Sequence, residues 1–155
     1  MREVDELILV DISASLEGRE PDYESVSEYS AECFVPLTVG GGVCSIEIIR
    51  KLLLAGADKV TINSAAFEKP DLITQAAGRF GSQCIVVSVD ARRRTDGAYE
   101  CFSHSGTQST GKEVGAWTAE VEKRGAGEIL ITSIERDGTM QGYDLELIRL
   151  VSKRV

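Results

Sequence analysis

The chain has 155 residues, of which 43% are hydrophobic and 27% charged, and its formal net charge at pH 7 is −8. Its length and apolar content predict one domain around a single core. The acidic balance, with Arg92-Arg93-Arg94 as the only basic run, argues against nucleic acid as a partner, and no stretch approaches the roughly 20 apolar residues that cross a membrane.

Apolar periodicity and turn residues predict strands that alternate with helices. The first strand is a short, almost unbroken apolar run, which is typical of a strand buried on both faces. In the first helix, Val26, Tyr29 and Ala31 have the spacing of one face. In chain order, the expected elements are a strand at 6–11, a helix at 22–33, a strand at 37–39, a helix at 45–55, a strand at 59–62, a helix at 71–79, a strand at 84–90, one arm of a hairpin at 99–103, a helix at 113–124, a strand at 128–133 and a helix at 145–155.

This alternation predicts an α/β fold with a parallel sheet and helical crossovers. Residues 55–60 resemble residues 124–129, each being a helix end, a glycine turn and a new strand. Such repetition favours a (β/α)8 TIM barrel, and the G-x-G-x-x-G fingerprint of a dinucleotide-binding sheet is absent. A whole barrel needs about 250 residues. We therefore expect one incomplete barrel domain of about five core strands over residues 1–155, with both chain ends cutting through the repeat.

Small and polar residues follow several of the predicted strands. The run Leu37–Gly42 ends in three glycines just before a helix, an arrangement in which bare backbone and helix N–H groups suit a phosphate. Asn63-Ser64 and Asp137-Gly138 follow later strands, and Asp11 and Asp90 end two others. Since parallel strands end at one edge, these residues predict one polar mouth.

The cysteines and the single histidine favour neither a metal site nor a disulfide framework. Cys33, Cys44, Cys84 and Cys101 form no C-x-x-C pair, and His104 is the only histidine. We expect no cofactor, reduced thiols, and a cytoplasmic protein without a signal peptide.

Six runs of the sequence resemble the cyclase-subunit family of imidazole glycerol phosphate synthase, from histidine biosynthesis. They are LVDISAS (9–15), PLTVGGG (36–42), GADKVTINSAA (56–66), GSQCIVVSVDARR (81–93), EKRGAGEILITSIERDGT (122–139) and GYDLELIR (142–149). Together they cover nearly the whole chain in register, and they correspond to the second through sixth βα units of that family.

The resemblance implies a (β/α)8 barrel that binds a ribotide substrate with two phosphates. It also implies a glutaminase partner whose ammonia closes the imidazole ring, with release of an aminoimidazole carboxamide ribotide. Two aspartates do the acid–base work in that family. One matches Asp90, and the other belongs to a first strand that these residues do not include. Asp11 is a second candidate, with polar support of the site as its main role.

Other positions take their expected roles from the same resemblance. Gly42, Asn63 and Ser64 match the first phosphate cradle. Asp137 and Gly138 match part of the second phosphate site, and Thr132 and Ser133 are expected to face the substrate. His104 is expected to be a residue of a covering loop rather than a base. Glu6, Lys59 and Glu128 begin strands, so they belong to the opposite rim, where they form either a structural ion-pair ring or a gate for ammonia.

Three alternatives remain open at this point. Residues 17–34 resemble related barrels that feed ammonia to a sugar amidation in surface-polysaccharide synthesis. The isomerase sister of the histidine pathway shares the phosphate loops, although the charged rim argues against it. The chain as it stands is also compatible with a non-catalytic fragment that self-associates through open sheet edges. We expect the 155 residues alone to have no cyclase activity, because they do not include the first-strand acid or most of the second phosphate site.

Overall fold

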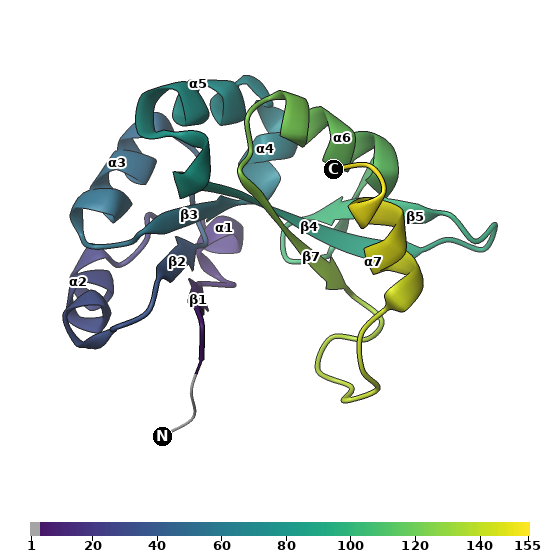
Figure 1. Ribbon diagram of the computed structural model, residues 1–155, viewed down its shortest axis with the longest axis horizontal. Helices are drawn as coiled ribbons and strands as arrows, with labels where there is room; N and C mark the ends of the chain where they lie inside the picture. The colour runs from purple at the N-terminus through teal and green to yellow at the C-terminus, as the bar shows by residue number, and fades with distance from the viewer. Residues whose placement is uncertain (1–3) are drawn as a thin grey trace.

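Five parallel strands form the centre of the fold. The computed structural model describes residues 4–155 (Figure 1). The strands are β1 (Leu7–Val10), β2 (Leu37–Gly40), β3 (Lys59–Ile62), β4 (Ile85–Arg93) and β7 (Glu128–Ser133), and they pair in the order β1-β2-β3-β4-β7. Within the described residues β1 pairs only with β2 and β7 only with β4, so the sheet follows part of a β/α barrel with two open edges. The expected α/β barrel class is confirmed.

Helices cover the outer, convex side of this curved sheet, as Figure 1 shows. The longer ones are α2 (Tyr23–Glu32), α3 (Ile46–Leu54), α5 (Asp71–Phe80), α6 (Val114–Lys123) and α7 (Leu145–Ser152). Sequence periodicity did not predict the short elements α1 (Ala14–Glu17), α4 (Ser64–Glu68) and η1 (Ser82–Cys84). The internal repeat has a conformational basis, because Gly56 and Gly125 both end a helix with positive φ, 106° and 101°.

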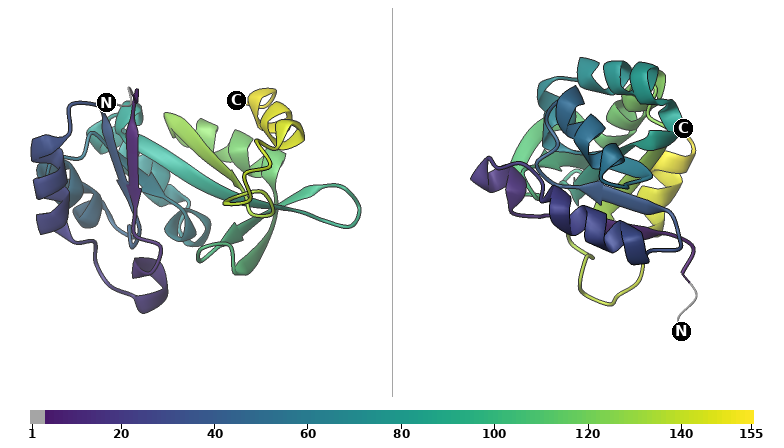
Figure 2. Two further views of the ribbon diagram at one scale, coloured as in Figure 1. Left: turned by 90° about the horizontal axis from the view of Figure 1, so that it is seen from below. Right: turned by 90° about the vertical axis from the view of Figure 1, so that its left-hand side faces the viewer.

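A hairpin interrupts the alternation of strand and helix. Strand β4 was expected to end at Asp90, but it continues to Arg93 because its last residues pair with the antiparallel β5 (Tyr99–Ser103). Strand β5 then pairs with β6 (Gln108–Glu113). Figure 2 shows the turn between β4 and β5 projecting away from the sheet. The turn between β5 and β6, residues 104–107, is called the hairpin tip, and its residues His104 and Ser105 lie at the mouth of the partial barrel.

The core lies between the sheet and the helices. Ile49, Ile73 and Trp117 are almost completely buried on α3, α5 and α6, and Trp117 stacks on Phe67 with ring centroids 4.6 Å apart. The helix expected at 22–33 is present as α2, but the expected common face of Val26, Tyr29 and Ala31 is wrong, since only Val26 is buried.

The two other residues of that expected face point away from the core. Tyr29 is 54% exposed, and Ala31 is exposed as well. No helix within residues 4–155 is both long and apolar enough to cross a membrane.

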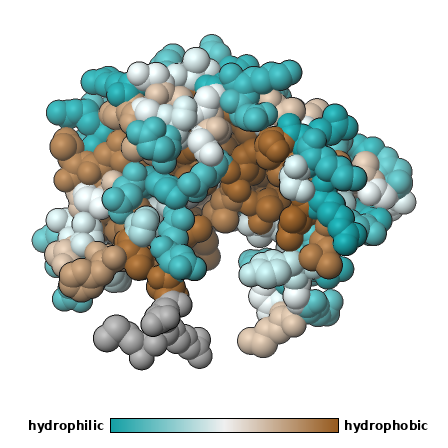
Figure 3. All heavy atoms as spheres, viewed as in Figure 1, coloured by the Kyte–Doolittle hydropathy of each residue, from teal (hydrophilic) through white to brown (hydrophobic). Residues whose placement is uncertain are grey.

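Apolar side chains also gather in the hollow on the inner side of the arc, as Figure 3 shows. Leu7, Ile8 and Val10 of the edge strand β1 are 43–45% exposed. A second hollow, of about 410 Å³, lies along β7 and α7. Both open edges of the partial barrel are therefore apolar.

Candidate functional site

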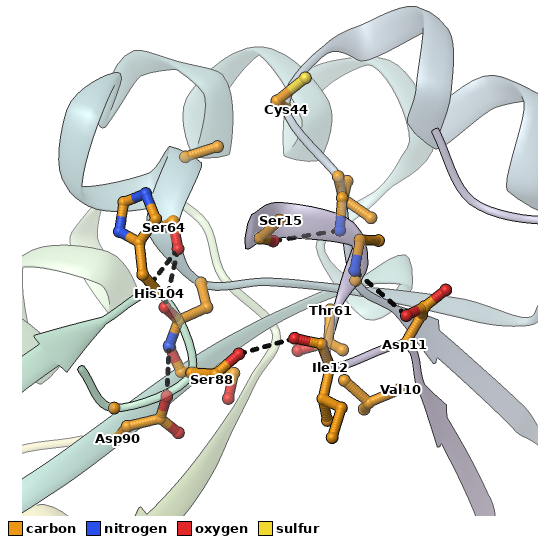
Figure 4. A pocket seen from close by; sticks show the side chains of 18 of the residues that line it. Val10, Asp11, Ile12, Ser15, Cys44, Thr61, Ser64, Ser88, Asp90 and His104 are labelled. Atoms are coloured by element: carbon orange, nitrogen blue, oxygen red, sulfur yellow. Dashed lines mark hydrogen bonds between the residues drawn. The ribbon is translucent and has the colours of Figure 1, made fainter. Parts of the chain in front are cut away.

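A cleft of about 770 Å³ lies at the carboxyl ends of the parallel strands. The residues that line it come from the ends of all five strands, from the connections and helix starts that follow them, and from the hairpin tip. Of the residues expected at this mouth, the lining includes Asp11, Gly42, Asn63, Ser64, Asp90, Thr132 and Asp137. In the view of Figure 4, Asp90, Ser64 and His104 lie on one side of the cleft, and Asp11 and Ser15 lie on the other.

Asp90 is the acid best placed for proton transfer. Its carboxylate accepts a hydrogen bond from Asn63 Nδ2 at 3.2 Å, and the same amide donates to the Ser88 carbonyl at 3.1 Å. Burial and the negative charge of Asp137 raise the pKa of Asp90, while the Asn63 hydrogen bond opposes the rise. A carboxyl group that keeps its proton to a higher pH is suited to general acid–base work.

The glycine turn after β2 depends on glycine for close packing. Gly42 has φ +68°, and a Cβ there would lie 2.6 Å from the Arg19 carbonyl oxygen. At Gly41, with φ +99°, a Cβ would lie 2.2 Å from the Asp11 carbonyl oxygen. Only glycine fits both positions, and the Gly42 N–H donates to Ser15 Oγ at 3.2 Å. Backbone N–H groups and small hydroxyls thus meet at one end of the cleft.

Asn63 and Ser64 connect β3 to α4 beside this turn. Ser64 Oγ accepts a hydrogen bond from the backbone N–H of His104 at 3.0 Å, so the hairpin tip lies against the expected phosphate cradle. The tip reaches further across the mouth, because Ser105 Oγ donates to the Ile12 carbonyl at 2.9 Å. Both tip residues have left-handed backbone conformations, with φ 51° at His104 and 55° at Ser105.

Asp11 is held by contacts within its own connection. It forms an ion pair with Arg19 at 2.6 Å and accepts hydrogen bonds from the backbone N–H groups of Ser13 and Ala14, both at 3.1 Å. The Arg19 guanidinium and the Ser13 contacts hold the pKa of Asp11 below its usual range. A carboxylate fixed in this way at the start of α1 is better suited to holding the connection after β1 in place than to proton transfer.

Of the two residues at the end of β7 that were expected to face the substrate, Thr132 and Ser133, only one lies in the cleft. Thr132 lines the cleft, whereas Ser133 does not, and its hydroxyl donates to Asp144 Oδ2 at 3.2 Å. Alternation along a strand explains this difference. In the segment that follows, Asp137 lines the cleft, while Gly138 is exposed and is not among the lining residues.

Glu6, Lys59 and Glu128 meet at the opposite rim, as their positions at strand starts predicted. Lys59 Nζ lies 3.1 Å from Glu6 Oε1 and 2.6 Å from Glu128 Oε1. Thr38 Oγ1 donates to Glu6 at 2.7 Å, and this hydrogen bond together with Lys59 lowers the pKa of Glu6. The pKa of Lys59 is raised, mainly by Glu128. The three side chains form one ion-pair cluster across β1, β3 and β7.

Sequence reasoning missed Arg19, Ser15, Thr61 and Ser88 as parts of the site. Arg19 lies in a connection eight residues after its partner, with no motif to link them, although the Asp-x-Ser sequence at 11–13 is a local signal for a capping carboxylate. Thr61 is buried inside β3, and its hydroxyl has no hydrogen-bond partner within the described residues.

Within residues 4–155, no three His, Cys, Asp or Glu side chains gather into a possible metal site.

Comparison with known proteins shows to which family the chain belongs. A model of the histidine biosynthesis protein family matches residues 1–155. Over 144 residues, which are 93% of this chain, the sequence is 55% identical to imidazole glycerol phosphate synthase subunit HisF of Dictyoglomus thermophilum. It is 54% identical, over the same length, to the protein of that name from Dictyoglomus turgidum. The chain spans 57% of the length of both relatives. With strand order, mouth and sequence in agreement, the chain belongs to the histidine biosynthesis protein family.

Proposed function

We propose that these residues are part of the cyclase subunit of imidazole glycerol phosphate synthase. The observation that carries the proposal is Asp90, a half-buried acid with a raised pKa that lies in a strand-end cleft between two sets of candidate phosphate ligands. The names of both relatives support the same activity. The reaction would use ammonia to form imidazole glycerol phosphate and an aminoimidazole carboxamide ribotide.

The residues of the cleft suit this reaction in distinct ways. Gly42, Asn63 and Ser64 would bind one phosphate of the substrate through backbone and side-chain donors. Thr132 and the segment with Asp137 and Gly138 would contribute to the second phosphate site. A substrate held at both ends would extend past Asp90, which would then exchange a proton with the ring atoms as the imidazole closes.

Asp11 would act indirectly in this mechanism. Its ion pair with Arg19 fixes the connection whose Arg19 carbonyl packs against Gly42. We assign Asp11 to the support of the mouth and Asp90 to proton transfer.

The charged rim supports a glutaminase partner as the source of ammonia. Lys59 bridges two carboxylates on different strands, so one side-chain movement would open or close the passage at this end. Glu6, Lys59 and Glu128 would therefore act as the gate that the family resemblance implies. Ammonia is small and neutral, and it would pass such a gate more readily than an ion.

Three further assignments belong to the same proposal. Residues 1–155 would form a single partial-barrel domain. Its location would be cytoplasmic, which is supported by the free thiols of Cys33, Cys44, Cys84 and Cys101. At high concentration the isolated chain would self-associate, because the outer edges of β1 and β7 have no strand partner within residues 4–155 and lie next to apolar side chains. Sedimentation equilibrium tests this, and a monomer at all concentrations contradicts it.

A chimeric enzyme tests the activity. In the Dictyoglomus thermophilum subunit, the matched 144 residues are replaced by those of this chain, and ammonia-dependent conversion of the formimino carboxamide ribotide is measured. We expect turnover in the chimera, its loss in Asp90→Asn, and no change in the control Asp5→Asn, whose side chain is exposed. A folded chimera without turnover, alongside an active parent, refutes the proposal and directs the next assay to sugar amidation.

A further inference from the structure

A tyrosine and a carboxylate join the two ends of the segment that follows β7. This segment, residues 134–143, begins after Ser133 and ends before Asp144, the N-cap of α7. Asp144 accepts hydrogen bonds from Ser133 Oγ at 3.2 Å and from the Leu147 N–H at 3.1 Å. One carboxylate therefore holds the segment where it leaves the strand and where it enters the helix. We call Tyr99, Ser133 and Asp144 the clasp.

Tyr99 provides the part of the clasp that comes from outside the segment. Its hydroxyl lies 3.0 Å from both carboxylate oxygens of Asp144. The Tyr99 side chain is only 6% exposed, and the Arg93 guanidinium lies 5.8 Å from the centre of its ring. Arg93 also forms an ion pair with Glu146 at 2.9 Å. The hairpin strand β5 is thereby tied to the first turn of α7.

The clasped segment carries a charge that acts on the cleft. Asp137 lines the cleft, and its charge contributes to the raised pKa of Asp90. Residues 135–143 are all exposed, Asp137 included. At one end of the segment, the N–H groups of Arg136 and Asp137 both donate to the Ser133 carbonyl. At the other end, the Arg136 guanidinium donates to the carbonyl of Tyr143, next to Asp144, at 3.1 Å. The place of Asp137 therefore depends on both ends that the clasp joins.

We propose that Tyr99 is a positioning residue that acts through Asp144 to hold Asp137 beside Asp90. The hydroxyl is suited to this role because it is a buried donor facing an ionised acceptor, and such hydrogen bonds are among the stronger ones in proteins. Asp144 is kept ionised, because its hydrogen bonds with Leu147, Tyr99 and Ser133 outweigh burial and lower its pKa. The catalytic consequence of this arrangement rests on the proposed function, whereas the positioning itself does not.

Carboxyl-carbon NMR of Asp90 in the 155-residue chain tests the positioning without any assay of turnover. The variant Asp137→Asn removes the charge directly, so it should lower the pKa of Asp90. Tyr99→Phe keeps the ring and removes only the hydroxyl, and it should lower the same pKa. In the double variant, the two effects should not add, because both act through the same charge.

The control is Tyr143→Phe, which removes a hydroxyl from the same segment at a side chain that is 82% exposed. It should leave the pKa of Asp90 unchanged. Amide exchange gives a second reading: in Tyr99→Phe, the N–H groups of Arg136, Asp137 and Leu147 should exchange about tenfold faster or more. Amides of the buried strand β3 should keep their rates, which separates loss of the clasp from general destabilisation.

Two results would overturn the proposal. One is an Asp90 pKa that Asp137→Asn lowers and Tyr99→Phe leaves unchanged. The other is an Asp90 pKa that does not respond to Asp137→Asn at all. If Tyr99→Phe does not fold, Ser133→Ala removes a single hydrogen bond of the clasp and is measured in the same way. Failure of the chimera to turn over its substrate would refute the proposed function and leave these NMR results as they stand.

Discussion

Replacement of Lys59 by methionine tests the ion-pair cluster at the charged rim. Lys59 lies 2.6 Å from Glu128 and 3.1 Å from Glu6, and its side chain is 18% exposed. Methionine keeps most of the apolar stem and removes the charge. The expected change in the free energy of unfolding is therefore electrostatic rather than a loss of packing.

The magnitude follows from the two distances. At the dielectric constant of water, charges 2.6 Å and 3.1 Å apart attract by about 1.6 and 1.3 kcal/mol. Fixing the lysine side chain costs up to about 2 kcal/mol in rotamer entropy, so the net contribution is about 1 kcal/mol. Because removal also leaves two carboxylates facing each other, we expect Lys59→Met to lower the free energy of unfolding at pH 7 by about 1–2 kcal/mol. In thermal unfolding of 155 residues, this corresponds to a decrease in Tm of about 2–8 °C.

The dependence on pH gives the sharper test. The pKa of Glu6 is lower in the folded chain than its ordinary value of 4.5. Its contribution to stability is therefore complete above pH 4.5 and is lost as the pH falls through the folded pKa. The wild type and Lys59→Met should converge in Tm over this acidic range. Lys123→Met, at an exposed lysine without an ion pair in the described residues, serves as the control. A difference in Tm that stays constant from pH 7 to acid would show that Lys59 acts through packing, and it would refute the reasoning.

Three further predictions concern the cleft and the core. Asp90→Asn should abolish ammonia-dependent turnover in the chimera while its circular dichroism stays unchanged; near-normal turnover would remove Asp90 from the mechanism. Gly42→Ala should lower the free energy of unfolding by about 1–3 kcal/mol, because its Cβ would lie 2.6 Å from a backbone oxygen; urea titration measures this, and an unchanged midpoint contradicts it. Trp117→Ala should cost about 3–5 kcal/mol in the same titration, since the side chain is 1% exposed and stacks on Phe67; a cost below that of a surface substitution would mean that the stack is not part of the core.

The parts of the fold that sequence predicted well are those with a strong repeating signal. Helix α3 has apolar residues at helical spacing and Ser45 as its N-cap, whose side chain accepts from the Ile48 N–H. Strand β3 was predicted with its observed bounds, because its apolar run is short and a glycine turn precedes it. Helix α4 has only five residues, too few for periodicity to distinguish from a turn.

The sequence predicted where the cleft lies, but it predicted only some of the contacts within it. Strand ends at one edge bring Asp90 and Asn63 together, and this rule holds for any parallel sheet. Arg19 reaches Asp11 through a connection whose path depends on tertiary packing. The orientation of Ser133 depends on register, because β7 pairs Thr132 with Asp90 and Ser133 with Ala91, and the sequence alone does not fix that pairing.

The two left-handed residues at the hairpin tip link occupancy of the cleft to the shape of its cover. For residues other than glycine, this backbone conformation costs about 1–2 kcal/mol each. At His104 and Ser105 it is stabilised by hydrogen bonds to Ser64 and to the Ile12 carbonyl. A ligand that takes over the Ser64 hydroxyl removes one of these restraints, and the tip is then free to relax into a less costly conformation. The conformational equilibrium of His104 and Ser105 would therefore shift when a ligand binds in the cleft.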